Sequence, residues 1–324
     1  MRLAVKYSIP LTGYVMFRLD EKLIDKTAFG VNIDGFDVEI KPLIDKRCSY
    51  KKEGDNYSTY GSNELSVTVT KDFDGNESEI NWHVVDKYEK SAEIATNRLL
   101  RYFQYKLNIP LLMLIDAHDD PWSNSPIILN RDENDKILSP SISCSDYSRN
   151  FAYGYYPKFG MKALTDINDE SLLDALKNEL APSLHEEFLC SARTEIIEGN
   201  IRRAVLEMAI CCEVFVKSNL FSGSSVSSAV FDYLSRQRKI EVSVSELLHQ
   251  PVKEVWGRSF KEDNLDDWKN ITYLFNARNR VAHSGVCEFR TDKGKRYDVD
   301  EFIVNDWWAS LEKMFSWLNE KLGK

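Results

Sequence analysis

Two hydrophobic patterns divide this chain of 324 residues. Up to about residue 85, residues that favour strands cluster or alternate between turn formers, at 5–9, 13–17, 36–40 and 65–69. From about residue 168, hydrophobic residues recur at the three- and four-residue spacing of an amphipathic helix. Because a sheet and a helical bundle bury different patterns, we expect an α+β protein with a β-rich N-terminal part and an all-α bundle after it.

The chain is long enough for two hydrophobic cores of ordinary domain size. Between about residues 139 and 156 it is rich in Ser, Tyr and Gly and has little periodicity, which is typical of a connection. We therefore expect a β-rich domain at 1–150 and a helical domain at 160–324. In the first domain, a helix over 87–106 should cover the sheet, and 111–115 should add a strand.

The helical part should begin with a hairpin of two helices. Hydrophobic stripes run from Phe188 to Ile197 and from Ala204 to Val216, and Gly199-Asn200 between them suits a helix end followed by a new N-cap. Further helices are predicted at about 224–238, at 265–283, and from Asp298 or Asp300 towards the C-terminus. These segments together form a compact bundle.

Composition narrows the class of protein. Hydrophobic residues make up 43% and charged residues 29%, as in ordinary folded proteins. The sequence shows neither a secretory signal nor the roughly 20 consecutive apolar residues of a membrane span, so we expect a cytoplasmic protein with no membrane partner. Its six cysteines include no CxxC pair, which favours reduced packing thiols over disulfides or a metal cluster.

The net charge of −9 argues against a protein that coats nucleic acid nonspecifically, because such binding needs many phosphate contacts. It is compatible with a nuclease. One scissile phosphate needs only a local group of cations, and distant acidic surface is screened beyond about 8–10 Å at physiological salt.

The segment Arg278-Asn279-Arg280-Val281-Ala282-His283 carries the most informative chemistry. Asn279 and His283 are four residues apart, so on a helix the amide could orient the imidazole by a hydrogen bond. Arg278 lies on an adjoining face, but its long side chain can reach a phosphate held beside His283. Arginine offers a permanent forked charge to phosphate oxygens, and histidine transfers protons near neutrality.

RNA cleavage by the 2′-hydroxyl needs these actions together. The hydroxyl loses a proton as it attacks phosphorus, the leaving 5′-oxygen gains one, and the phosphorane charge needs stabilisation. One histidine fits two proton transfers poorly, whereas a symmetric homodimer would bring two copies of Arg278 and His283 into one composite cleft. The alternative for an isolated Arg and His at this spacing is a surface salt bridge and a favourable charge at a helix C-terminus.

Arg278, Asn279 and His283 resemble the signature of the HEPN superfamily (higher eukaryotes and prokaryotes nucleotide-binding). This signature is Arg, four to six residues and then His, often with a polar residue directly after the Arg. Residues 192–200, 204–206 and 213–215 look like its opening helical hairpin. The resemblance covers about residues 168–322.

The resemblance implies a metal-independent endoribonuclease that needs no cofactor, acts on RNA as a homodimer, and leaves a 2′,3′-cyclic phosphate and a 5′-hydroxyl. It also suggests a toxin or antiviral defence effector, in which the β-rich domain acts as a sensor or selects the substrate. The sequence names neither an activating ligand nor an antitoxin. Because some members of the superfamily are inactive, the alternative function is a noncatalytic scaffold that binds nucleotide, RNA or protein.

Several cations near the motif are candidates for binding RNA. Arg290, Lys293, Lys295 and Arg296 lie in a loop just after it, either as an RNA-guiding loop or as a solvated hairpin tip. Arg280 could contact RNA or remain solvated, and a solvated side chain is favoured.

Two acidic features carry weaker predictions. Glu213, in an apolar helix, could support the site by pairing with Arg278 or another base, or it could lie exposed on the helix edge. Asp116, His118, Asp119 and Asp120 could bind a divalent metal, although their order follows no established ligand spacing, so a solvated acidic loop is favoured and no metal is assigned.

Overall fold

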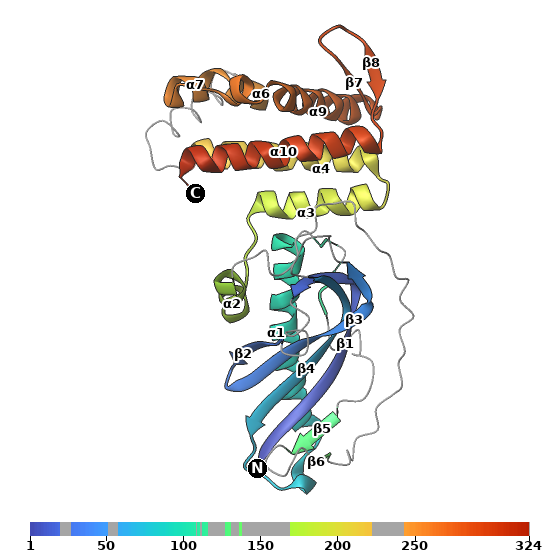
Figure 1. The fold of residues 1–324 in the computed structure, drawn as a ribbon, viewed down its shortest axis with the longest axis vertical. Helices are drawn as coiled ribbons and strands as arrows, with labels where there is room; N and C mark the ends of the chain where they lie inside the picture. Colours follow the sequence, from blue (N-terminus) through green and yellow to red (C-terminus); the bar gives the residue numbers. More distant parts are fainter. Residues whose placement is uncertain are drawn as a thin grey trace. The chain divides into compact units, whose positions relative to one another are not determined.

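The computed structural model describes residues 1–19, 27–50, 58–107, 109–110, 112–115, 127–130, 136–137, 169–221 and 243–323. The chain divides into two compact units, Met1–Ala181 (unit 1) and Pro182–Lys324 (unit 2). Unit 1 contains an antiparallel sheet and unit 2 is mainly helical, which confirms the α+β class (Figure 1).

Unit 1 is built on a six-stranded antiparallel sheet in the order β2-β3-β4-β1-β5-β6. Its strands are β1 (Arg2–Leu19), β2 (Phe29–Ile33), β3 (Phe36–Tyr50), β4 (Ser58–Asp72), β5 (Ile127–Asn130) and β6 (Lys136–Ile137). Strand β1 joins the two strands predicted at 5–9 and 13–17. The intervening turn formers are accommodated as an irregularity in the pairing with β4, between Pro10 and Val15, so the strand continues past them.

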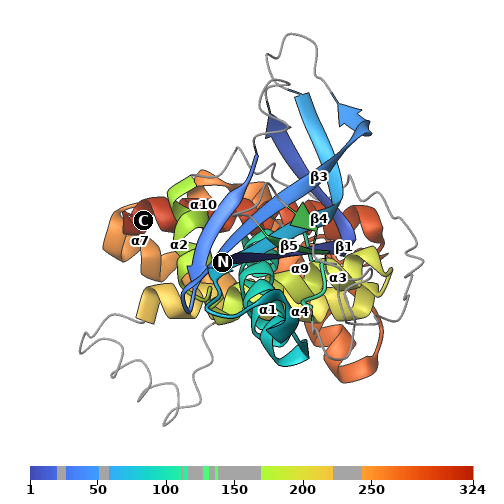
Figure 2. The same ribbon diagram turned by 90° about the horizontal axis from the view of Figure 1, so that it is seen from below.

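Helix α1 (Trp82–Lys106) lies across one face of this sheet, as predicted (Figures 1 and 2). It begins earlier than 87 because the Asn81 side chain accepts a hydrogen bond from the Val84 amide, which caps the helix. Leu99 and Phe103 on the inner face are fully buried. Phe103 meets Phe17 of β1 edge to face, with ring centroids 6.3 Å apart, so the core of unit 1 lies between helix and sheet.

The strand predicted at 111–115 is wrong for the described residues 112–115, which belong to no strand. Side chains of α1 form hydrogen bonds with the backbone of these residues, in place of bonds from a neighbouring strand. The Asn97 amide donates to the Ile115 carbonyl and accepts from the Ile115 amide, both at 2.7 Å, and Gln104 donates to the Leu112 carbonyl. Backbone groups satisfied by side chains need no ladder.

The boundary between the units lies further along the chain than the 150–160 region that the sequence indicated. Helix α2 (Asp169–Lys177) belongs to unit 1, although its periodicity resembles that of the bundle. Arg98 of α1 donates to the carbonyl groups of Leu176 and Lys177 at 2.9 and 2.8 Å. These bonds to the C-terminal end of α2 tie it to the helix that covers the sheet.

The described part of unit 2 contains four long helices with roughly parallel axes, α3 (Leu184–Ile197), α4 (Ile201–Phe221), α9 (Leu265–Ser284) and α10 (Glu301–Leu322) (Figure 1). These confirm the predicted hairpin and the two later helices, and the helix predicted at 224–238 lies outside the described residues. The other elements are α6 (Val244–Leu247), α7 (Gln250–Trp256), α8 (Phe260–Asp263), β7 (Glu288–Arg290) and β8 (Arg296–Asp298). None of the described helices combines the length and the hydrophobicity needed to cross a membrane.

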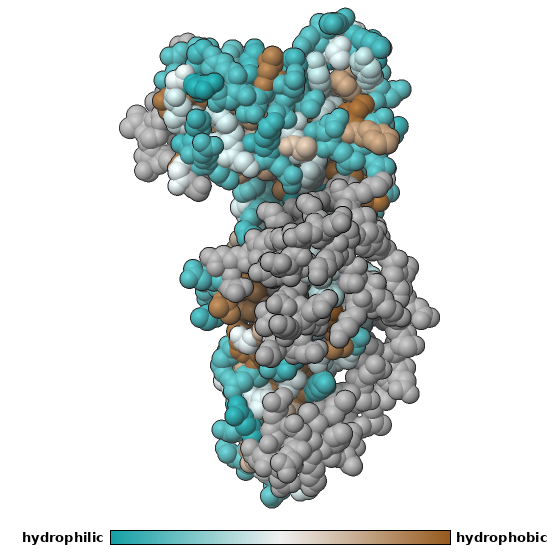
Figure 3. Space-filling model, viewed as in Figure 1, coloured by the Kyte–Doolittle hydropathy of each residue, from teal (hydrophilic) through white to brown (hydrophobic). Residues whose placement is uncertain are grey.

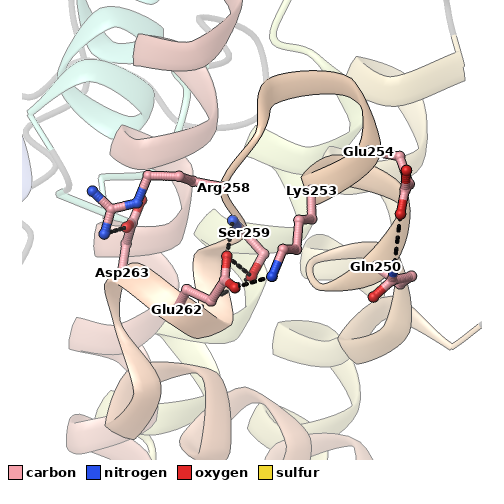
Figure 4. Close-up of polar contacts among 7 residues, drawn as sticks. All are labelled: Gln250, Lys253, Glu254, Arg258, Ser259, Glu262 and Asp263. Carbon is pink, nitrogen blue, oxygen red and sulfur yellow. Dashed lines mark hydrogen bonds and ion pairs between the residues drawn. The ribbon is translucent and has the colours of Figure 1, made fainter.

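The short helices α7 and α8 are joined by polar contacts at one end of the bundle (Figure 4). Ser259 and Glu262 cap α8 reciprocally, and Glu262 also pairs with Lys253 of α7. The hydrogen bond from Lys253 holds the pKa of Glu262 below its usual value. Arg258, between α7 and α8, forms an ion pair of 2.6 Å with Asp263 at the end of α8, so the connection between the helices is also bonded to α8.

Cysteines in the bundle serve as packing residues. Cys211 and Cys212 are fully buried in α4. Burial raises the pKa of Cys211 to about 12 and that of Cys212 well above its usual value, so both stay neutral thiols near pH 7. Every cysteine whose side chain is described is free, in agreement with the prediction from the sequence.

Candidate functional site

The Arg278–His283 segment occupies the last two turns of α9. The helix ends at Gly285, which adopts a left-handed conformation with φ of 68° and donates its amide to the Val281 carbonyl. Glycine takes this conformation without steric cost, so the sequence itself stops the helix there. His283 therefore lies exposed in the final turn, directly before the chain reverses.

Contrary to the prediction, the Asn279 side chain does not hydrogen-bond to His283. Its side-chain oxygen accepts a hydrogen bond of 3.0 Å from Nη1 of the half-buried Arg278. A bond from a cationic donor is stronger than one between neutral groups, which explains why the amide turns to its neighbour in the sequence. Within the described part of the chain, no side chain hydrogen-bonds the His283 ring.

An open pocket of about 490 Å³ lies beside the end of α9. Residues at positions three, four and seven apart share one helix face, which brings the α9 members of the lining together. Arg290 enters from β7, which folds back along the helix. The lining residues are Asn276, Asn279, Arg280, His283, Ser284 and Arg290.

The hairpin of β7 and β8 is held against α9 and α10 by aromatic rings. Phe289 is buried, with its ring 5.1 Å from that of Tyr273 and 5.4 Å from that of Trp307. Tyr297 stacks on Phe289 at 5.6 Å. This packing fixes β7 beside α9, so Arg290 keeps its place in the pocket wall.

Glu288 joins the hairpin to α9 electrostatically, a role that was not predicted from the sequence. Its side chain is only 14% exposed and forms an ion pair with Arg280, and Nη1 of Arg296 lies 3.8 Å from the same carboxylate oxygen. Arg280 is thus a paired residue in the pocket wall, rather than the solvated side chain favoured from the sequence. One carboxylate oxygen therefore lies near both guanidinium groups.

The four cations predicted after the motif divide between the pocket and the hairpin. Arg290 faces Arg296 directly in the strand pairing, an arrangement of like charges that costs stability. Within the described residues no carboxylate pairs with Arg290, whereas Arg296 lies near Glu288. Lys293 and Lys295 are exposed and do not line the pocket, and the Lys295 ammonium lies 4.6 Å from the Tyr297 ring centroid. Of the four, Arg290 alone borders His283 across the pocket.

The remaining predicted residues lie away from the pocket lining. Arg278 contacts it only through Asn279. Glu213 forms an ion pair with Lys217, one turn along α4, which matches the expected pairing with another base rather than with Arg278. The acidic run that begins at Asp116 falls outside the described residues, and within them no group of three or more potential ligands could hold a metal ion.

The exposed surface of unit 2 is mainly hydrophilic in the view of Figure 3, with a small hydrophobic group beside the base of the hairpin. Three exposed apolar or aromatic side chains lie in the hairpin or next to it in the sequence, Val286 at 41%, Tyr297 at 38% and Phe302 at 81%. At 81%, Phe302 is the most exposed large hydrophobic side chain among those that the structure describes.

Comparison with known proteins gives this chain no relative. No protein-family model, curated protein or solved structure matches it. The motif and the pocket are therefore the features of this chain that point to a function.

Proposed function

We propose that the chain is a metal-independent endoribonuclease of the HEPN type, with its reactive centre at the end of α9. The observation that carries this proposal is the pocket that gathers the His283 imidazole with the guanidinium groups of Arg280 and Arg290. A proton-transfer group beside fixed cations suits a phosphodiester whose charge increases in the transition state.

In the proposed reaction, a 2′-oxygen forms a bond to the adjacent phosphorus as the bond from phosphorus to the 5′-oxygen breaks. His283 accepts the proton of the 2′-hydroxyl or delivers one to the leaving oxygen, and the arginines stabilise the phosphorane. Arg278, bonded to Asn279 at the pocket wall, adds positive charge nearby. The products are a 2′,3′-cyclic phosphate and a 5′-hydroxyl, and the reaction needs no metal.

The two proton transfers favour a homodimer. Among the described residues each pocket contains one histidine. Val286, two residues after the end of α9, and Phe302, in the first turn of α10, are exposed apolar residues that a partner could cover. A C2 partner that covers this surface would supply a second His283 and Arg278. A role as a toxin or antiviral effector, with unit 1 as a sensor, follows from the HEPN resemblance.

The test is cleavage of mixed RNA in the presence of EDTA by the wild type, Arg278→Ala and His283→Ala proteins. We expect the wild type alone to yield fragments with cyclic phosphate and 5′-hydroxyl ends. The control is His83→Ala, which removes an exposed histidine of unit 1 and should cleave like the wild type. Equal cleavage by wild type and His283→Ala would exclude His283 from the chemistry.

A noncatalytic HEPN binding module is the second candidate, favoured by the Asn279 amide, which is bonded to Arg278 instead of to the histidine. Such a protein binds nucleotide or RNA without turnover. It predicts that Arg278→Ala lowers affinity for RNA while no variant, nor the wild type, produces new RNA ends.

A further inference from the structure

The pocket contains two amide side chains that the proposed chemistry does not use. Asn276 and Asn279 lie three residues apart on the same face of α9, and both are exposed. The Asn279 oxygen is bonded to Arg278, but the Asn276 amide forms no hydrogen bond with any residue that the structure describes. Its donor and its acceptor are both available to a ligand.

An amide that offers a donor and an acceptor side by side suits the edge of a nucleobase, which presents the same two kinds of group. The imidazole and the guanidinium groups lie in the same pocket as Asn276. The pocket thus combines chemistry that distinguishes bases with chemistry that binds phosphate.

The dimensions of the pocket fit one nucleotide. Its volume of about 490 Å³ lies within the roughly 300–1,000 Å³ typical of small-ligand sites. In a duplex, base pairing already occupies the Watson–Crick edges, whereas an unpaired base presents them to protein. The chain's net charge of −9 also suits short local contact better than a long duplex track.

We propose that this pocket takes one unpaired nucleotide of single-stranded RNA, and that Asn276 hydrogen-bonds its base and sets the base preference at the cleavage position. This inference rests on the proposed nuclease function. The phosphate next to that nucleotide lies against Arg290 and His283, and Asn276 is a specificity residue rather than a catalytic one.

Sequencing of cleavage sites tests the role of Asn276. Wild type, Asn276→Ala and Asn276→Asp proteins would cleave a pool of unpaired RNA with randomised sequence. We expect a base preference in the wild type that falls by about 10-fold in Asn276→Ala and changes to another base in Asn276→Asp, whose side chain only accepts hydrogen bonds when ionised. The control is Asn319→Ala in the last turn of α10, which should keep the wild-type preference.

Binding separates this inference from the proposed function. In the His283→Ala background, short single-stranded RNAs should bind more tightly than the same sequences in a duplex, and Asn276→Ala should weaken binding to the preferred base. If the wild type cleaves RNA but Asn276→Ala leaves both preference and affinity unchanged, the base-reading role is excluded and the nuclease stands. Equal binding of duplex and single strand overturns the unpaired-nucleotide site. A protein that neither binds nor cleaves RNA overturns both proposals.

Discussion

The carboxylate of Glu288 lies near one arginine of the pocket wall and one arginine of the hairpin. Glu288 pairs with Arg280 on α9, and its carboxylate lies 3.8 Å from Arg296 on β8. Arg290 is paired with Arg296 across the hairpin and lines the pocket together with His283. Because the Glu288 side chain is largely buried, its charge is poorly screened by solvent. It offsets the repulsion between the opposed arginines of the hairpin.

We expect Glu288→Gln to destabilise the folded protein by about 1–3 kcal/mol, because the partly buried Arg280 guanidinium loses its ion-pair partner at nearly constant volume. It should also raise KM for RNA more than it lowers kcat, since the hairpin would hold Arg290 less firmly. Urea denaturation and steady-state cleavage measure the two effects.

The matched control for Glu288→Gln is Glu320→Gln, which changes an exposed glutamate in the last turn of α10. Its stability and KM should equal those of the wild type. If the two variants unfold at the same urea concentration, Glu288 does not join the hairpin to α9.

The spacing of Asn279 and His283 predicts that they share a helix face, and both line the pocket, because contacts three or four residues apart are decided locally. The predicted hydrogen bond from the Asn279 amide to His283 was wrong, because the amide oxygen accepts a bond from Arg278 instead. The positions of Glu288 and Arg290 depend on how the chain packs after Gly285. Such nonlocal contacts leave no periodic signal in the sequence.

At the scale of elements, capping residues hold the short helices that local propensity alone would not stabilise. Ser259 is fully buried and is the N-cap residue of α8, where it contacts Glu262 (Figure 4). Ser259→Ala should lower the free energy of unfolding by about 1–2 kcal/mol, since the amide of Glu262 loses its acceptor.

Thermal and urea unfolding would measure the effect of Ser259→Ala. The control is Ser316→Ala on the exposed face of α10, where the hydroxyl only donates to the Glu312 carbonyl one turn earlier. That change should alter stability little. A loss of stability as large as that of Ser259→Ala would argue against a special role for the cap.

The sequence predicted elements well where one periodicity continues unbroken, as in α1 and α9, because each helix needs only its own hydrophobic stripe. It predicted two strands where β1 is one, since Pro10 and Gly13 resemble turn formers until the pairing with β4 is known. For residues 112–115, the hydrophobic run favours a strand, but bonds from Asn97 and Gln104 decide the conformation.

At the scale of the whole molecule, the division into units follows contacts rather than periodicity. Helix α2 has the pattern of the bundle, yet its C-terminal carbonyl groups are bound by Arg98 of unit 1. Hydrophobic spacing defines which face of a helix is buried but not which partner covers it. The same ambiguity applies to the exposed Val286 and Phe302 of unit 2, whose partner in the proposed enzyme is a second copy of the chain.

Phe302→Glu tests that partner. The side chain is 81% exposed in the first turn of α10, next to the hairpin in the sequence, so burial against a second copy would remove it from water. A buried phenylalanine contributes about 1.5–3 kcal/mol, and a charge in its place is unfavourable without a partner. The variant should therefore dimerise at least about 10-fold more weakly in analytical ultracentrifugation.

The control for Phe302→Glu is Val255→Glu, which adds the same charge at a residue 73% exposed on α7, away from the hairpin. It should dimerise like the wild type. Since the proposed reaction draws one His283 from each copy, Phe302→Glu should also lose cleavage at concentrations where it is monomeric and recover it when concentrated. A wild type that cleaves RNA as a monomer would show that one chain performs both proton transfers, and the composite site would have to be abandoned.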